Sequence, residues 1–226
     1  MVFTPIVELR QYTLRPGRRD ELIELFDSAL VESQEDVGMT VIGQFRDLDR
    51  PDRFVWLRGF PSMDERRASL EAFYTGPVWK THSKAANATM LESDDVLLLR
   101  PATPESAFSL DGETRGADPG GDGPGFVGVT ILDLDGAYPL EVLERLEVPE
   151  GGSLLGCLVT DPSPNTFPAL PVREDENVLA RFAGYADRDA LELVSPEAGR
   201  LLRLAPTSRS LLHGQSPACR ATKGDR

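Results

Sequence analysis

The chain has 226 residues, 40% of them hydrophobic, which is enough for one large or two small globular domains. Its formal net charge of −13 repels phosphate backbones and anionic lipid headgroups, and its basic residues occur singly or in pairs. No apolar stretch approaches the roughly 18 residues that a membrane span needs, and the N-terminus has no signal-peptide pattern. We therefore expect a cytoplasmic protein with neither nucleic acid nor membrane as a partner.

The few cysteines and histidines indicate little metal or redox chemistry. Cys157 lies in an apolar run and Cys219 in a polar tail, which is not a disulfide framework. The two histidines, His82 and His213, lie in different halves, and neither has a neighbouring ligand motif. We expect no bound metal and no cofactor.

The first 101 residues alternate between strand-like and helix-like patterns. β-Branched and aromatic residues predict strands over residues 6–14, 40–47, 54–60 and 96–99. Apolar residues at helical spacing predict helices over 18–36 and 62–91, the second broken at Gly76-Pro77. The order β-α-β-β-α-β is typical of the ferredoxin-like fold.

The rest of the chain repeats this order in abbreviated form after a segment rich in Pro, Gly, Ser, Glu and Asp, residues 102–125, which we interpret as a linker. Strands are predicted at 126–134 and 153–160 and a short helix at 139–146. Residues 178–191 align with residues 54–67. The closing segment Ser210-Leu-Leu-His-Gly corresponds to Val96-Leu-Leu-Leu-Arg at the end of the first half. The pattern indicates an internal duplication.

The sequence thus predicts an α+β protein of two tandem ferredoxin-like units, each an antiparallel sheet with helices on one face. The expected division is a first domain at 1–101, the linker at 102–125, a second domain at 126–214 and a disordered tail at 215–226. A sheet covered on one face leaves its other face bare. The two halves therefore either pack together as an intramolecular pseudo-dimer or pair with another chain in a homodimer.

Five blocks of sequence follow one another in the first half. They are VELRQYTLRPG from Val7, GMTVIGQFRDLD from Gly38, RFVWLRGFPSM from Arg53, FYTGPVWKTH from Phe73 and ANATM from Ala86. Together they resemble the NIPSNAP family, which is built from dimeric α/β-barrel units. The second half has no counterpart of the FYTGPVWKTH block, so a site of this type is expected once per chain.

The resemblance implies a pocket between the helices and the sheet but leaves the reaction open. Related proteins include cofactor-independent monooxygenases, polyketide cyclases, isomerases, haem-degrading enzymes and proteins that only bind. Our leading hypothesis is a protein that encloses a small hydrophobic molecule, aromatic or polyketide-like, and acts on it as an oxygenase, cyclase or isomerase. The alternatives are a non-catalytic binding or assembly protein and a haem protein with His82 as axial ligand.

The second helical stretch carries one group of candidate residues. Spacings of three and four place on one face Trp79, His82, Ala86 and Met90, with Asn87 beside them. His82 in apolar surroundings would be neutral and able to act as a catalytic base; the alternative is a structural or half-exposed histidine. Tyr74 and Trp79 would form the wall of a substrate site for a flat molecule, or else belong to the core.

The strands carry the other candidates. Alternation places on one sheet face Glu8, Arg10 and Tyr12 of the first strand, and Phe54, Trp56, Arg58 and Phe60 of the third. Arg10 or Arg58 would hold a carboxylate or stabilise an enolate, or else pair with Glu8 across the sheet. Gln44 would donate to a bound oxygen or form a cross-strand hydrogen bond. Tyr12 and Trp56 complete the candidate substrate site.

Overall fold

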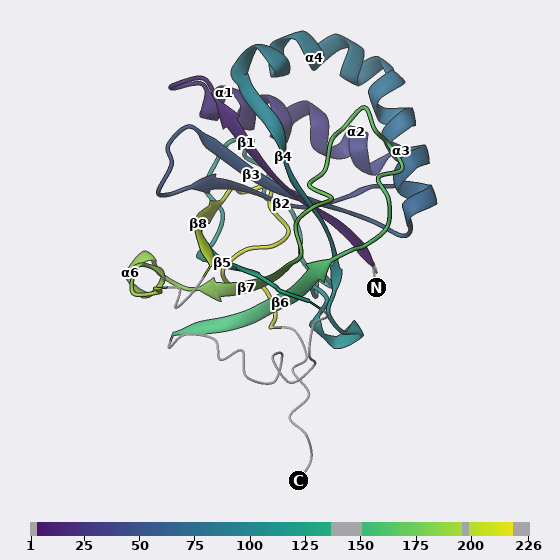
Figure 1. Cartoon of the computed structure of the whole chain (residues 1–226). Coiled ribbons are helices and arrows are strands. Elements are labelled where there is room, and N and C mark those ends of the chain that lie inside the picture. The colour runs from purple at the N-terminus through teal and green to yellow at the C-terminus, as the bar shows by residue number, and fades with distance from the viewer. Residues whose placement is uncertain (1–3, 137–150, 196–198, 219–226) are drawn as a thin grey trace.

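The strands of both halves close into a single barrel in the computed structural model, which describes residues 4–136, 151–195 and 199–218 (Figure 1). The strands are β1 (Ile6–Leu14), β2 (Thr40–Asp47), β3 (Arg53–Phe60), β4 (Met90–Pro101), β5 (Phe126–Asp133), β6 (Gly152–Thr160), β7 (Val178–Tyr185) and β8 (Arg200–Pro206). Around the barrel they follow the order β1-β3-β2-β8-β5-β7-β6-β4, and each of these neighbouring pairs is antiparallel.

The helices begin and end where the sequence carries local signals. They are α1 (Arg19–Leu25), the π-helical segment η1 (Phe26–Leu30), α2 (Val31–Glu35), α3 (Met63–Thr75), α4 (Pro77–Thr89), the 3-10 turn η2 (Pro104–Ser106) and α6 (Arg188–Glu192). The Ser62 side chain caps α3 by accepting from the Glu65 amide, and Pro77 occupies the first turn of α4. After α2 the chain turns at Gly38, whose φ of 94° favours glycine.

The two halves have equivalent topologies, which confirms the expected tandem of ferredoxin-like units. The first half has the strand order β4-β1-β3-β2 and the second half β8-β5-β7-β6. They join at two seams, β2 with β8 and β4 with β6. A β-bulge occurs at Gly43 in β2 and at the equivalent Gly156 in β6. A Cβ atom at these positions would lie 2.5 Å from the Phe45 ring and 2.7 Å from the Phe108 ring, so both bulges require glycine.

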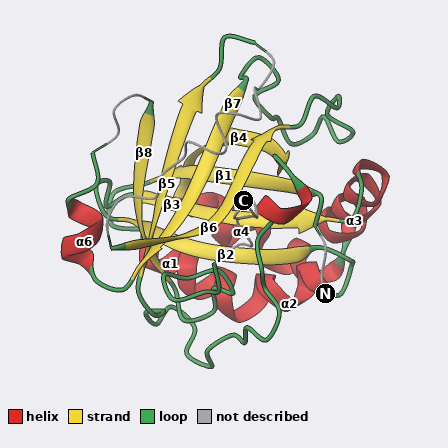
Figure 2. Ribbon diagram, turned by 90° about the horizontal axis from the view of Figure 1, so that it is seen from below, coloured by secondary structure: helices red, strands yellow, loops and turns green. Residues whose placement is uncertain are grey.

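The barrel interior is the apolar core that both halves share. Alternating residues of every strand point inward, among them Leu9, Leu57, Val129 and Phe182, all of them buried. Phe108, from the segment between the halves, packs against this core with its ring centroid 4.9 Å from that of Phe182. Strands of both halves lie side by side around this interior (Figure 2). Each half therefore covers the sheet face that the other would leave bare.

A second core lies outside the barrel, between the sheet of the first half and its helices. Helices α1 to α4 gather over β1–β4 (Figure 1) and bury residues such as Leu22, Phe26 and Leu70 against the strands. The second half is thinly covered in the described residues, where α6 is its one helix. Within the described ranges no helix combines the length and apolar character needed to cross a membrane.

Three details differ from the expectations or fall outside the described residues. The closing strand of the second half is β8 and not residues 210–214, which form turns beyond it, because β8 supplies the edge that pairs with β2. Met90 begins β4 and does not end a helix, since it pairs with Leu14 of β1. The expected helix at 139–146 lies outside the described residues, as do positions 219–226 of the expected tail.

The shared barrel predicts one cooperative unfolding transition for both halves. Separating them would expose the inner core and unpair the seams β2–β8 and β4–β6 at once. Differential scanning calorimetry should give a calorimetric enthalpy close to the van't Hoff enthalpy. Two resolved transitions would contradict this coupling.

Candidate functional site

One carboxylate surrounded by three guanidinium groups lies between the first sheet and its helices. Glu8 Oε2 accepts from Arg10 Nη1 at 2.7 Å and from Arg58 Nε at 2.8 Å. Glu8 Oε1 accepts from Arg66 Nε at 2.7 Å. None of the four side chains is more than 1% exposed. We call these residues the Glu8 cluster.

The cluster follows from strand register and helix periodicity. Glu8 lies opposite Arg58 in the β1–β3 pair, on the face of the sheet that the helices cover, and Arg10 follows two residues later on the same face. Arg66 comes from α3, where it shares the buried face with Leu70. The cluster therefore ties a helix to the two central strands of the first sheet.

The positive charges of the cluster outnumber its one negative charge. Burial alone would raise the pKa of Glu8, but attraction from Arg58, Arg10 and Arg66 outweighs it and holds the pKa well below its ordinary value of 4.5. Burial lowers the pKa of Arg66, although a guanidinium remains charged in proteins. Three positive charges face one negative charge, so the buried site carries an excess of two positive charges.

A small cavity of about 20 Å³ lies next to the cluster, which is room for about one water molecule. Its walls are mainly aromatic and include Tyr12, Phe26, Trp56, Phe73, Tyr74 and Trp79. The Arg58 guanidinium carbon lies 5.0 Å from the centroid of the Trp56 ring, and that of Arg10 lies 5.4 Å from the Tyr12 ring. The charged groups therefore lie directly against rings that form the cavity wall.

Two buried donors beside the cavity have no hydrogen-bond acceptor. They are Arg58 Nη2 and Trp56 Nε1, both on β3. Buried polar hydrogens are normally satisfied, and leaving one unpaired costs about 1–3 kcal/mol. The Tyr12 hydroxyl accepts from Arg10 Nε at 2.9 Å, and burial raises the pKa of Tyr12, which favours the neutral phenol. The site is thus rich in donors.

The second half of the chain covers this site. The segment between β6 and β7, residues 161–177, rises beside α2 and α3 (Figure 1). Arg66 Nη1 donates to Asn165 Oδ1 at 3.0 Å and to Thr166 Oγ1 at 3.3 Å. The Phe167 ring stacks on Tyr74 with centroids 6.1 Å apart. A segment of the second half is therefore bound both to the Glu8 cluster and to the aromatic wall.

The structure brings most of the predicted strand residues together. Arg10 and Arg58 both contact Glu8, which is the ion pair that we set out as the alternative to ligand binding. Tyr12 and Trp56 line the cavity. Gln44 is buried on the same face, but its amide donates to Asp27 Oδ1 at 3.3 Å in η1 and not across the sheet.

The predicted helix residues separate into two groups. Tyr74 and Trp79 line the cavity, with ring centroids 5.0 Å apart, and Met90 joins them from the start of β4. His82 is half-buried on α4 and is not among the cavity-lining residues, and Asn87 is exposed. The structure thus brings Tyr74 and Trp79 together at the cavity, whereas His82 is not among the residues that line it.

Arg66 is the functional candidate that the sequence interpretation missed. It stands next to Arg67, and the sequence analysis gives neither of these two arginines a role. Its spacing from Leu70 and Phe73 places it on the apolar face of α3, whereas Arg67 is exposed. A charged residue in phase with a buried stripe is the signal that would have identified it.

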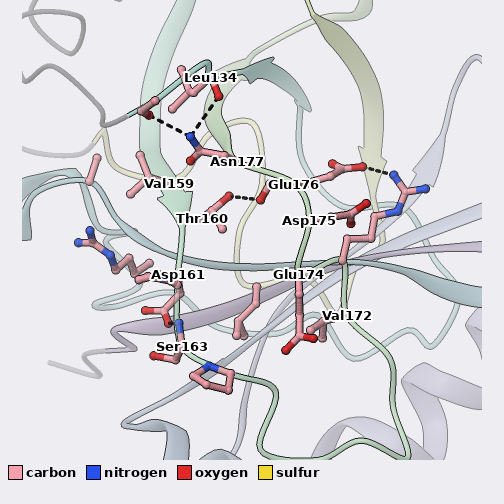
Figure 3. Close-up of a pocket in the computed structure, with 17 residues that line it drawn as sticks. Leu134, Val159, Thr160, Asp161, Ser163, Val172, Glu174, Asp175, Glu176 and Asn177 are labelled. Carbon is pink, nitrogen blue, oxygen red and sulfur yellow. Dashed lines mark hydrogen bonds and ion pairs between the residues drawn. The ribbon is translucent and has the colours of Figure 1, made fainter.

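A larger, open groove of about 940 Å³ lies elsewhere, along β6 and the segment that follows it (Figure 3). Several of its polar side chains form hydrogen bonds within the protein. Asn177 Nδ2 donates to Leu134 O and Gly136 O, and Thr160 Oγ1 donates to Glu176 O (Figure 3). None of its lining residues in the described part has a buried unpaired polar side-chain atom. We therefore place the candidate site at the Glu8 cluster and the aromatic cavity.

In residues 4–136, 151–195 and 199–218 no group of three or more His, Cys, Asp or Glu side chains is placed to hold an ion. The chemistry of the site is that of guanidinium charges and aromatic surfaces.

Substituting Glu8→Gln is expected to destabilise the fold by about 3–5 kcal/mol, because three buried guanidinium groups would lose their one carboxylate. Urea unfolding measures this change. Glu71→Gln, on the exposed face of α3, is the control and should change the free energy of unfolding by less than about 0.5 kcal/mol. Equal effects of the two substitutions would contradict a structural role for the cluster.

The lowered pKa of Glu8 also predicts a pH dependence. Because the pKa is lower in the folded than in the unfolded protein, its stabilisation is complete above about pH 4.5 and is lost as the pH falls further, by about 1.4 kcal/mol per unit. NMR of the Glu8 carboxyl carbon during acid titration should show an ionised side chain well below pH 4.5. A titration midpoint at or above 4.5 would refute the assignment.

Comparison with solved structures places this architecture among known folds. A proposed monooxygenase from Lactobacillus acidophilus is 14% identical and aligns with a TM-score of 0.50 over 90% of this chain and 94% of its own, so it shares the fold across both halves. A NIPSNAP family protein from Agrobacterium tumefaciens is 22% identical, with a TM-score of 0.40 over 44% of this chain and 94% of its own.

The matches to the NIPSNAP family cover the first half of the chain. A NIPSNAP-like domain protein from Burkholderia xenovorans is 25% identical, with a TM-score of 0.41 over 44% of this chain and 86% of its own. No curated protein matches the chain. The NIPSNAP family model matches residues 7–104, which include β1 to β4, the helices above them and all four residues of the Glu8 cluster. Residues 7–104 of this chain therefore form a NIPSNAP domain.

Proposed function

We propose that this protein binds a small hydrophobic molecule with an aromatic or polyketide-like body between the helices and the sheet of its NIPSNAP domain. The observation that carries the proposal is the aromatic cavity beside buried arginines, where Arg58 Nη2 and Trp56 Nε1 lack acceptors. Ligand sites commonly combine apolar walls with a few convergent polar groups. A ligand oxygen would satisfy donors that the protein leaves unpaired.

Binding requires the cavity to open. At about 20 Å³ it is almost filled by its own walls, and a molecule larger than water needs some of these side chains to move. Tyr74, Trp79 and Met90 are only half-buried, and Phe167 belongs to a connecting segment and not to a helix or strand. We propose that ligand entry separates Phe167 from Tyr74.

We favour ligand binding over assembly through the sheets. The assembly hypothesis needs a bare sheet face, but the inner faces of both sheets pack against each other within one chain. The strand edges that another copy would use, those of β2 and β4, are paired with β8 and β6. The barrel surfaces predicted to form a homodimer are therefore already occupied.

A more specific proposal is that the protein also catalyses a reaction of the molecule that it binds. A ligand held against Arg10 and Arg58 would have a developing enolate stabilised by guanidinium charge, as an oxygenase, cyclase or isomerase requires. The base in this version remains His82, which lies three residues after Trp79 on α4 and is not among the residues that line the cavity. Binding does not depend on a base.

Isothermal titration with 1-naphthol as a neutral aromatic probe tests the binding proposal. We expect wild-type protein to bind, and Trp79→Ala to weaken binding roughly threefold to tenfold through loss of a stacking surface. Leu193→Ala is the control, because Leu193 is a large apolar side chain with 85% exposure, remote from the cavity walls.

Circular dichroism verifies that both variants keep the fold. Absence of binding to wild-type protein, or equal loss in both variants, would contradict a specific aromatic site in the NIPSNAP domain.

A further inference from the structure

The Glu8 cluster lacks a counter-charge. Arg10, Arg58 and Arg66 each contact Glu8, and in the described part of the chain no other carboxylate forms an ion pair with any of them. Their other hydrogen bonds go to neutral atoms, and Arg58 Nη2 has no acceptor. Arg58 Nη1 donates to Gln34 Oε1 at 3.3 Å, while Arg66 Nη1 uses the amide and hydroxyl oxygens of residues 165 and 166.

Burying uncompensated charge is costly, since each ion loses its hydration and gains only partial compensation from neutral dipoles. Structural ion pairs usually approach neutrality for this reason. Here Glu8 is shared among three partners, and Arg58 still keeps one nitrogen without an acceptor. A site that retains two excess positive charges next to a cavity is suited to bind an anion.

We propose that the ligand carries an anionic oxygen group, a carboxylate or an enolate, which binds at the Arg58 and Trp56 donors while its apolar body occupies the aromatic cavity. This inference rests on the proposed function and specifies its substrate class. A guanidinium nitrogen and an indole N–H both donate, so the complementary group accepts only. Charge-assisted hydrogen bonds to such a group are stronger than neutral ones.

The surroundings favour an organic anion over a simple inorganic one. The unpaired donors belong to Arg58 and to Trp56, and the Trp56 ring lines the cavity together with Tyr12 and Trp79. An inorganic anion would be strongly hydrated and would gain nothing from these rings, whereas an aryl or polyketide acid would bury its carbon skeleton against them. Arg66 links the same cluster to residues 165 and 166, so the covering segment is coupled to the charge that the anion would neutralise.

The test compares two probes of nearly equal shape at neutral pH, 1-naphthoate with an anionic carboxylate and 1-naphthamide with a neutral amide. Isothermal titration of wild-type protein should give at least tenfold tighter binding of 1-naphthoate. Arg66→Gln reduces the excess from two charges to one and should lower this preference several-fold. Arg67→Gln, its exposed neighbour on α3, leaves the cluster intact and should keep the full preference.

Sodium acetate and inorganic phosphate are titrated in the same series to separate the two sources of anionic oxygen. They should bind at least tenfold more weakly than 1-naphthoate, and equal binding would overturn the assignment to an organic acid.

Equal affinity for naphthoate and naphthamide would overturn the anion inference and leave the proposed binding function standing. Binding of neither probe would overturn both. If Arg66→Gln keeps the full preference for 1-naphthoate over 1-naphthamide, the Glu8 cluster is not the source of that preference. The two probes are compared on wild-type protein, so the inference remains falsifiable even if Arg66→Gln does not fold.

Discussion

The Glu8 cluster joins more elements of this protein than any other polar contact described above. One carboxylate on β1 is hydrogen-bonded to arginines of β1, β3 and α3, and the α3 arginine reaches the segment between β6 and β7. Buried ion networks specify one arrangement because a displaced partner leaves an unpaired charge in a medium of low dielectric constant. The cluster therefore fixes helix α3 on the sheet and holds the second half over the first at the place where the cavity lies.

The two halves share a topology but have different roles. The first half carries the helical layer, the cavity and all four cluster residues. The second half completes the barrel through β8 and β6 and supplies Asn165, Thr166 and Phe167 as a cover. In a symmetric dimer of single domains each copy would have to perform both roles with one sequence. Two units in one chain are free of this constraint, which agrees with a second half that keeps the strands and lacks the FYTGPVWKTH block.

The excess positive charge of the site indicates that it binds an anion, whereas its cavity is too small to hold one in the closed state. Both observations are explained if the cavity opens on ligand binding. The cavity is too small for an organic molecule, yet the polar groups around it are unbalanced by two positive charges and two unpaired donors. A site that was purely structural would be expected to approach neutrality with its hydrogen bonds satisfied. A closed state held by neutral acceptors and ring stacking, from which an anion could displace the cover, agrees with both observations.

The sequence by itself determined the order of the elements, the tandem of ferredoxin-like units and the likeness of the first half to the NIPSNAP family, because strand alternation, helical spacing and short motifs are local. It also placed Glu8, Arg10 and Arg58 on one sheet face with Tyr12 and Trp56. Only the tertiary structure decided that Arg66 completes the cluster, that residues 161–177 cover it, that β8 and not residues 210–214 closes the barrel, and that His82 lies apart from the cavity. Those outcomes depend on contacts between residues far apart in the sequence, about 100 positions for Arg66 with Thr166 and about 160 for Phe45 with Pro206. No local pattern encodes which distant segment will pack against a given face.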